Sequence, residues 1–536
     1  MNKLTMKMRL FAAFLLLGLW GADAQTAREQ IAAVPERAGG IYHSYEYRPA
    51  AAAPAPDGYT PFYISHYGRH GSRWHASESV YAGPLKILRK AAEAGALTPL
   101  GRDVLGRVEI IAADADKRYG DLSPRGVAEH RGIAERMYKA YPEVFSTADG
   151  RECRIESRST LVPRCILSMA AFNERLKELN PAIRTTRESS ARYMPYMGNN
   201  KGLDAQRDRT LKTADSVRAA RLIPDRLMKS LFSDPEFVKR EVKKPRKLME
   251  QLLLQAAIMQ DVDYLGISLY DLFTGEEIYA AWEDENFRRY VMFGPSKRFG
   301  DPIIADAKPL LRNIVETAEE VIGGGKELAA SLRFGHDVNV IPLLALLGVE
   351  GASARVSTPE EAAEVWQVHR VSPMAANVQF IFFRNPAGDV LVRILHNERD
   401  AGLPPAAVPI TAGKPSGITA NRCTNNARLA AGRSGVNENA RTLQESAHFI
   451  LLFTCLGADF SRPNPFFLVL SAGVPCRSGF RVWRQGFVLV VSVTRFLFRG
   501  NLSGWGFFPG DFLPPPSETF RETFFGLFRA GTVPLN

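Results

Sequence analysis

Residues 69–73 combine one histidine with two arginines on a turn that contains glycine, in the order Arg-His-Gly-Ser-Arg. A phosphate ester that is cleaved without a metal needs a nucleophile in line with phosphorus, cationic donors for the phosphoryl oxygens and a proton for the leaving alcohol. The neutral imidazole of His70 is a competent nucleophile, and the guanidinium groups of Arg69 and Arg73 match phosphate oxygens. Gly71 lets the backbone approach closely. The pattern predicts a phosphate cradle, with a surface histidine beside arginines as the alternative.

The elements around this cradle alternate between strand and helix. Residues 61–67 (PFYISHY) predict a strand directly before it, and Ser123 is a plausible N-cap for a helix over 124–141. Further strands are expected at 153–157, 328–334, 377–383 and 390–395, and further helices at 78–95, 100–118, 308–322, 338–347 and from a cap at Thr160 to about Leu179. Such alternation is typical of an α/β fold. We therefore predict a Rossmann-like central sheet flanked by helices, with the active site at the carboxyl ends of its central strands.

The domain organisation follows from changes in pattern along the chain. Residues 200–295 are almost entirely helical in pattern, which predicts an α-helical cap over about 196–299, inserted into an α/β domain made of 25–195 and 300–404. Residues 405–536 contain one lysine against 12 arginines and over-use phenylalanine. We interpret this irregular tail as the product of a frameshift or as disordered, and a genuine Arg/Phe-rich domain is the alternative.

The N-terminus has the pattern of a secretory signal peptide over residues 1–24. Lys3, Lys7 and Arg9 precede an apolar stretch from Leu10 to Trp20, and the small-x-small sequence at 22–24 can be cleaved. The alternative is a membrane anchor, but the apolar stretch is short for a span. We expect a periplasmic or secreted protein with no stable membrane span after cleavage.

The histidine motif resembles that of the histidine acid phosphatases, branch two of the histidine phosphatase superfamily. That family carries RHGxRxP near its N-terminus and an HD or HAE element far downstream, and this chain has RHGSRWH at 69–75 and His336-Asp337 after an expected strand. His75 stands where the family usually has proline. The resemblance implies a phosphohistidine at His70, phosphate binding by His336 and protonation of the leaving oxygen by Asp337.

Two of these assignments have alternatives in the sequence. Asp337 also stands where an ordinary helix N-cap would stand, although an aspartate with a pKa near 4 suits a general acid in acidic medium. The family has another phosphate-binding arginine after a strand, and Arg158 is the match that we favour on strand-end geometry. Arg164 is the less favoured candidate, as a helical surface residue or a cap contact.

The similarity extends over about residues 40–400 and indicates a subgroup. Stretches at 123–145, 157–172 and 270–282 look closest to bacterial relatives of multiple inositol polyphosphate phosphatase, as found in Bacteroidetes. The resemblance implies inositol polyphosphates such as phytate as substrate. Those enzymes usually carry HAE, so a broad-specificity acid phosphatase on sugar phosphates or nucleotides and an inactive phosphate-binding remnant stay open. Basic candidates for a phytate pocket are Lys201, Arg207 and Arg209, with solvated surface residues as the alternative.

Other chemistries lack their motifs in this sequence. There is no GxxxxGK[ST], no GxGxxG after a strand, no HExxH and no GxSxG, so no metal or organic cofactor is implied. Most of the net charge of +11 comes from the tail, and the rest of the chain shows no clustered basic face, so no nucleic-acid partner is expected. Among five cysteines, Cys153 and Cys165 could form a disulfide, and two small buried residues are the alternative.

Overall fold

The computed structural model describes residues 26–49, 54–198, 204–403, 420–423 and 426–429. The predicted signal peptide and nearly all of the predicted irregular tail therefore lie outside the described residues. Within the described part of the chain, no helix combines the length and the apolar character that a bilayer crossing needs.

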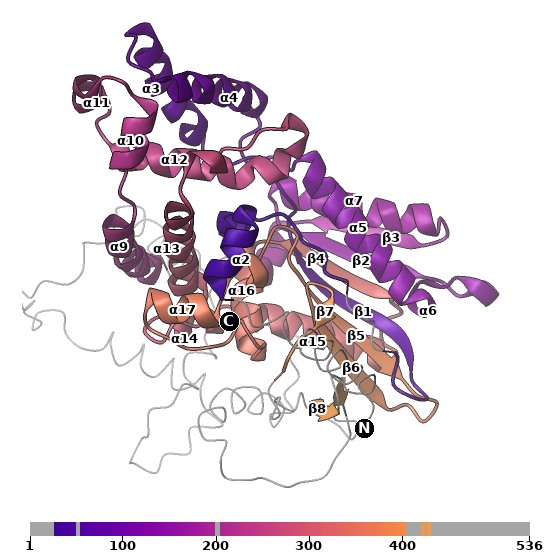
Figure 1. The fold of residues 1–536 in the computed structure, drawn as a ribbon. Helices are drawn as coiled ribbons and strands as arrows, with labels where there is room; N and C mark the ends of the chain where they lie inside the picture. Colours follow the sequence, from indigo (N-terminus) through magenta and orange to yellow (C-terminus); the bar gives the residue numbers. More distant parts are fainter. Residues whose placement is uncertain (1–25, 50–53, 199–203, 404–419, 424–425, 430–536) are drawn as a thin grey trace, which may run out of the picture. The chain divides into compact units, whose positions relative to one another are not determined.

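The centre of the fold is a mixed sheet with the strand order β3-β2-β4-β1-β5-β6-β9-β8 (Figure 1). Its strands are β1 (Thr60–Arg69), β2 (Arg154–Ser159), β3 (Arg184–Ser189), β4 (Ala330–Gly335), β5 (Asn377–Arg384), β6 (Val390–His396), β8 (Ala420–Cys423) and β9 (Asn426–Leu429), and a short β7 (Arg399–Asp400) also pairs with β6. The four strands from β3 to β1 run parallel, whereas β5 and β6 pair antiparallel.

The register brings the carboxyl ends of three parallel strands to one edge of the sheet. Arg69 at the end of β1 lies opposite Gly335 at the end of β4, and Ser159 at the end of β2 lies opposite Phe334. Residues that follow β1, β2 and β4 in the sequence therefore meet at this edge, although they are separated by tens to hundreds of positions along the chain.

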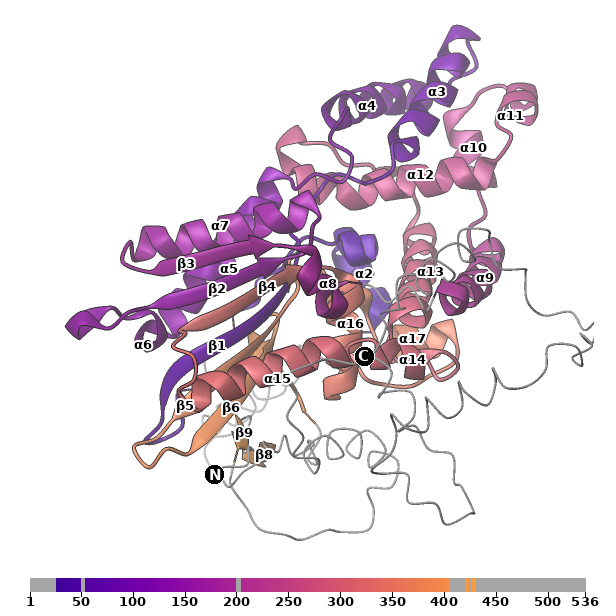
Figure 2. The same cartoon turned by 180° about the vertical axis from the view of Figure 1, so that it is seen from behind.

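Helices cover both faces of the sheet (Figure 2), and apolar side chains of its central strands face them. Helices α5 (Pro124–Ala140) and α7 (Pro163–Leu179) bury side chains against one face, together with Ile64 of β1. Helices α15 (Lys308–Ile322) and α16 (Asp337–Leu347) bury theirs on the other, where Tyr63 and Tyr67 point, because neighbouring residues of a strand face opposite sides. The predicted α/β fold with a central sheet flanked by helices is confirmed.

A group of helices lies beyond the carboxyl edge of the sheet (Figures 1 and 2). Its members are α9 (Asp204–Arg221), α10 (Asp225–Leu231), α11 (Pro235–Glu241), α12 (Pro245–Ile258), α13 (Gly275–Phe293), α3 (Ser79–Glu93) and α4 (Pro99–Ala115). Helices α3 and α4 contact α12 and α10, and the Thr98 N–H donates to the Leu231 carbonyl at 3.0 Å. The helical region thus includes α3 and α4, which lie in the segment that we assigned to the α/β domain. The predicted domain boundaries stay a prediction.

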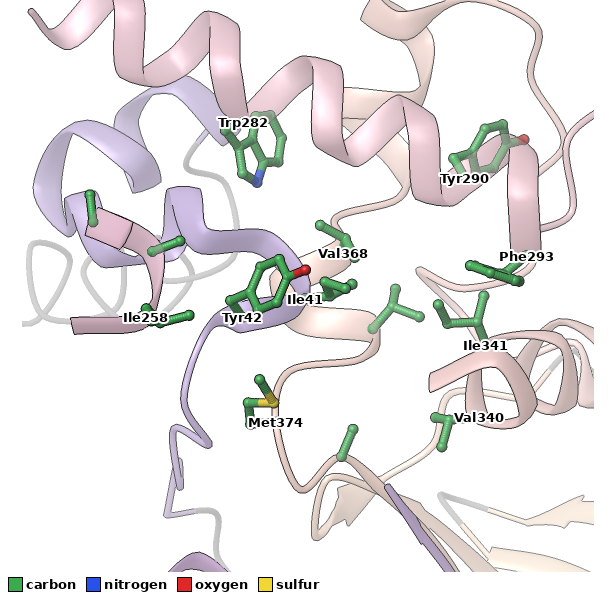
Figure 3. Packing of buried hydrophobic residues seen from close by; sticks show 14 of the residues in the cluster. Ile41, Tyr42, Ile258, Trp282, Tyr290, Phe293, Val340, Ile341, Val368 and Met374 are labelled. Carbon is green, nitrogen blue, oxygen red and sulfur yellow. The ribbon is translucent and has the colours of Figure 1, made fainter. Parts of the chain in front are cut away.

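Helix α13 is joined to the sheet region by one continuous apolar core (Figure 3). Trp282 of α13 is fully buried, and Tyr290 and Phe293 lie along the same helix near Val340 and Ile341 of α16. The shorter helices are α2 (Ala27–Ala33), η1 (Pro35–Tyr42), α6 (Pro142–Phe145), η2 (Ala148–Gly150), η3 (Ala191–Tyr193), α8 (Met194–Met197), η5 (Met259–Leu265), η6 (Tyr270–Leu272), α14 (Gly300–Ala305), α17 (Pro359–Val365) and α18 (Val368–Val371).

Candidate active site

His70 follows the last residue of β1 and is buried. Its Nδ1 lies 2.9 Å from the Gly71 carbonyl oxygen, and since a carbonyl can only accept, Nδ1 carries the ring proton. The Nε2 atom therefore keeps its lone pair. Burial, followed by the positive charges of Arg69 and Arg73, holds the pKa of His70 well below the usual 6.5. The imidazole is thus neutral, which is the form that can attack phosphorus.

The turn after His70 packs tightly against the start of α5. A Cβ atom on Gly71 would lie 2.5 Å from the Gly126 carbonyl oxygen, and one on Gly126 would lie 2.3 Å from the Ser72 carbonyl oxygen. Gly71 thus lets the turn approach helix α5 closely, and its predicted approach to a phosphate stays a prediction. Ser72 is held from the same helix, because its N–H and its hydroxyl both donate to Glu129 at 2.7 Å.

Three arginines surround His70, and Arg69, Arg73 and Arg164 all lower its pKa. Arg69 is fully buried and donates from Nη1 to the carbonyl oxygens of Ile41 and Ser372 at 2.7 and 2.8 Å. The Nε atoms of these three arginines are buried and have no hydrogen-bond partner among the described residues. Buried donors without partners are costly in a folded protein, so their convergence on one histidine indicates an anion site.

His336 and Asp337 follow β4 and complete the cluster. The His336 ring lies edge-on to the His70 ring at 5.6 Å between centroids, and its Nε2 lies 3.2 Å from the Thr160 hydroxyl. Burial, then Arg164, lowers the pKa of His336 to about 4. Our prediction that Thr160 caps the following helix is wrong, because α7 begins at Pro163 with Val162 as its N-cap.

Asp337 is the first residue of α16 and is buried. Burial alone would raise the pKa of its carboxyl group, but the positive charges of Arg69 and Arg289 outweigh burial and lower it. Arg289 comes from α13 and is bound to Glu285 at 2.6 Å. Sequence reasoning missed Arg289, since it lies in the middle of a long helix with no local motif around it.

Arg158, the arginine that we favoured, has carboxylate partners. Its guanidinium lies 3.1 Å from Glu156 and 3.8 Å from Glu188, and it covers the ring of Tyr193 at 4.9 Å. Arg164, the less favoured candidate, is one of the charges that lower the pKa of His70, and the assignment of Arg158 stays a prediction. The sequence feature that could have indicated Arg164 is its position as the second residue of α7, shortly after the end of β2.

A pocket of about 250 Å³ opens beside the cluster, between η1, α12 and α13. Its lining includes Tyr42, His75, Arg288 and Arg289. His75, which replaces the proline of the family pattern, accepts the Ser77 N–H at Nδ1, so its Nε2–H donates to the Tyr42 hydroxyl at 3.2 Å.

Among the remaining predicted residues, Cys165 lies beside the cluster, with its Sγ atom 3.7 Å from His336 Nε2. Lys201 and the side chain of Arg207 are not among the described parts, and Arg209 is exposed. Cys153 and Cys165 are both buried and free, as in the second of our two alternatives. Among the described residues, no three or more histidine, cysteine or acidic side chains form a group that could hold a metal.

The fold and the cluster together define an α/β protein with a neutral histidine among arginines at the carboxyl edge of its sheet. The chain belongs to the histidine phosphatase superfamily (branch 2), whose family model matches residues 111–397. The match includes Arg164, His336 and Asp337 and begins after the 69–73 motif. The predicted family is therefore confirmed.

Solved structures share this fold at low sequence identity. Multiple inositol polyphosphate phosphatase of Bifidobacterium longum in complex with inositol hexasulfate has a TM-score of 0.59 and 19% identity, over 72% of this chain and 96% of that one. Its complex with phosphate has a TM-score of 0.57 and 18% identity, over 70% and 95%. The phytase of D. castellii has a TM-score of 0.50 and 14% identity, over 72% and 84%. No curated protein matches the chain.

Proposed function

We propose that this protein is a phosphomonoester hydrolase that works through a phosphohistidine at His70, with inositol polyphosphates such as phytate as substrate. The observation that carries the proposal is the unprotonated Nε2 of His70 among three arginines whose buried Nε atoms have no partner in the described chain. Family membership supports phosphatase chemistry at this site.

In the first half-reaction, His70 Nε2 attacks phosphorus and the bond from phosphorus to the leaving oxygen breaks. Arg69, Arg73, Arg164 and His336 bind the phosphoryl oxygens, and Asp337 gives its proton to the departing alcohol. In the second half-reaction, Asp337 takes a proton from water, the water oxygen attacks phosphorus, and the bond to His70 breaks. The scheme uses no metal and no organic cofactor.

The protonation of Asp337 depends on the substrate in this scheme. In the free protein, Arg69 and Arg289 lower the pKa of the carboxyl group. A phosphate dianion bound among the arginines offsets their positive field, so it raises the pKa of Asp337 and favours the protonated donor. Binding of the substrate thereby prepares the acid for the first step.

The choice of phytate is supported by the shared fold with an inositol polyphosphate phosphatase that binds inositol hexasulfate. A broad-specificity acid phosphatase is the second candidate, and the pocket beside the site favours it. Glu250, Asp284 and Glu285 line that pocket. Its arginines form ion pairs, Arg288 with Asp215 at 3.3 Å and Arg289 with Glu285 at 2.6 Å. Such a lining suits a leaving group with few charges.

The test is release of inorganic phosphate from phytate and from p-nitrophenyl phosphate by the full chain at mildly acidic pH, beside His70→Ala as the control. Release that disappears in the control, with phytate preferred, is the expected result. Equal or better turnover of simple esters would select the broad-specificity phosphatase. A folded protein that binds phosphate without turnover would be an inactive remnant. The predicted signal peptide places the enzyme in the periplasm or outside the cell, which cell fractionation would check.

A further inference from the structure

A buried chain of hydrogen bonds connects the phosphate cradle to the helical region, and no step of the mechanism above uses it. The Asp261 carboxyl group in η5 lies 2.8 Å from the Ser44 hydroxyl, which lies 3.1 Å from the Ser72 hydroxyl. Ser72 in turn lies 2.7 Å from Glu129 of α5. All four residues are buried. This series of hydrogen bonds therefore has a carboxyl group at each end.

The number of protons available along these contacts favours one protonated carboxyl group. The chain has three oxygen-to-oxygen contacts, whereas the hydroxyl groups of Ser44 and Ser72 supply only two protons. With both carboxyl groups ionised, one contact would hold two oxygens together without a proton, which is repulsive. One further proton on a carboxyl group makes every contact a hydrogen bond.

The surroundings of the two carboxyl groups decide which of them holds that proton. Glu129 accepts three donors, namely the N–H groups of Tyr45 and Ser72 and the Ser72 hydroxyl, at 2.7–2.8 Å. Asp261 has the Ser44 hydroxyl at Oδ1 and a weaker stabilising effect of the Ser72 hydroxyl, and its Oδ2 atom is buried with no partner among the described residues. Burial raises the pKa of Glu129 as well, but its three hydrogen-bond donors oppose that rise, so we assign the anion to Glu129 and the acid to Asp261.

We propose that Asp261 is a positioning residue that carries a proton in the folded protein and, through Ser44 and Ser72, holds the 69–73 cradle in its phosphate-binding shape. This role rests on the proposed phosphatase function. In this arrangement, Asp261 donates its hydrogen bond to Ser44, Ser44 donates to Ser72, and Ser72 donates to Glu129. Since Ser72 lies between His70 and Arg73, loss of the Asp261 proton removes one of the supports of the cradle.

The charged and titratable groups that face Asp261 agree with this assignment. They are Glu129 of α5, Arg73 of the cradle, Tyr81 of α3 and Tyr270 of η6. Burial, followed by the negative charge of Glu129, raises the pKa of Asp261 to about 8, against the smaller opposing effect of Arg73. Ionisation of Asp261 therefore belongs to mildly alkaline pH.

A raised pKa in the folded state makes the acid stabilising at low pH, and this contribution is lost as pH rises towards the folded pKa. Asp261→Asn keeps a neutral donor and removes the titration. The unfolding temperature of Asp261→Asn minus that of the wild type should therefore increase from about pH 4, near the unfolded pKa of aspartate, to about pH 8, and then stay constant. Asp263→Asn is the matched control, since Asp263 is an exposed residue of the same turn that pairs with Arg125. The unfolding temperature of this control minus that of the wild type should not increase in this way between pH 4 and pH 8.

Infrared difference spectra of the full chain at pH 7 test the position of the proton directly. The wild type minus Asp261→Asn should show the carbonyl stretch of a protonated carboxylic acid, and the wild type minus Asp263→Asn should not. A band that persists in Asp261→Asn and disappears in Glu129→Gln would overturn the assignment. An unfolding difference that does not change with pH would overturn it as well.

Binding of inorganic phosphate tests the positioning role. Asp261→Asn should bind phosphate as the wild type does at pH 6 and severalfold more tightly than the wild type at pH 9, whereas Asp261→Ala should bind weakly at both. Equal affinities of wild type and Asp261→Asn at both pH values would overturn the role. If neither the wild type nor any variant binds phosphate, the proposed function fails. The infrared band then still shows whether Asp261 is protonated.

Discussion

At the scale of single residues, the site depends on how each charged group is partnered. Arg158 is the second-to-last residue of β2 and has Glu156 and Glu188 beside it, whereas Arg164 follows the strand and its positive charge lowers the pKa of His70. A guanidinium already bound to carboxylates has less positive charge to offer a phosphate. We therefore propose Arg164 as the third arginine of the cradle.

We predict that Arg164→Ala lowers kcat/KM for p-nitrophenyl phosphate by about 10²–10³, the range for loss of one charge-stabilising donor. Arg158→Ala, the matched control, should change it by less than about tenfold. Steady-state kinetics of the two variants with equal unfolding temperatures measure this difference. The opposite order of effects would return the role to Arg158.

The proton donor at Asp337 makes a second prediction at this scale. Asp337→Asn should lower kcat on phytate by about 10²–10⁴ and affect p-nitrophenyl phosphate much less, because p-nitrophenolate leaves without a proton. In the wild type, kcat should fall as pH rises and the carboxyl group in the substrate complex ionises, and this fall should be absent in the variant. Identical losses on both esters would show that Asp337 is not the acid.

At the scale of elements, the cradle is shaped by contact with a helix. Gly71 and Gly126 approach each other so closely that neither position has room for a Cβ atom. The N-terminus of α5, capped by Ser123, thereby sets the path of the backbone between His70 and Arg73. Glu129 of the same helix holds Ser72 by two hydrogen bonds.

Gly71→Ala should therefore push α5 and the cradle apart. We expect a loss of about 1–3 kcal/mol in the free energy of unfolding, as for overpacked positions, with a large loss of phosphate affinity. Gly106→Ala is the control, because a Cβ there meets nothing within 4 Å and α4 should become slightly more stable. Urea unfolding and phosphate titration provide the measurements. A Gly71→Ala protein with unchanged affinity would mean that the contact with α5 does not shape the cradle.

At the scale of the whole molecule, buried histidines make the stability of the described fold depend on pH. His66 of β1 and His130 of α5 both contact the ring of Phe334, and their ring nitrogens have no hydrogen-bond partner among the described residues. Burial lowers the pKa of each to about 3. Below about pH 6.5 the unfolded chain binds protons that the folded chain does not, so the fold loses stability as pH falls.

The free energy of unfolding should accordingly fall between pH 6.5 and pH 4, with each of the two histidines contributing up to about 1.4 kcal/mol per pH unit. Urea unfolding at several pH values measures the slope. The double variant His66→Leu and His130→Leu should have a flatter slope than the wild type. A slope that stays the same in the double variant would assign the pH dependence to other groups.

The sequence by itself determined the strands and helices with strong periodicity and the two motifs at strand ends. The predicted helix at 308–322 matches α15, and His70 and His336 follow β1 and β4 as expected, because strand-turn-helix patterns are local. Strand β3 was missed, since its sequence RTTRES is polar and gives no apolar alternation.

Only the tertiary structure decided which distant groups act together. Arg164, Arg289, Glu129 and Asp261 come from four helices, and no spacing in the sequence relates them to His70. The parallel register of β1, β2 and β4 brings the strand ends to one edge, and the apolar core around Trp282 joins α13 to the sheet region. Burial, charge and hydrogen-bond partners depend on these contacts through space, so the state of each acid, base and arginine follows from packing.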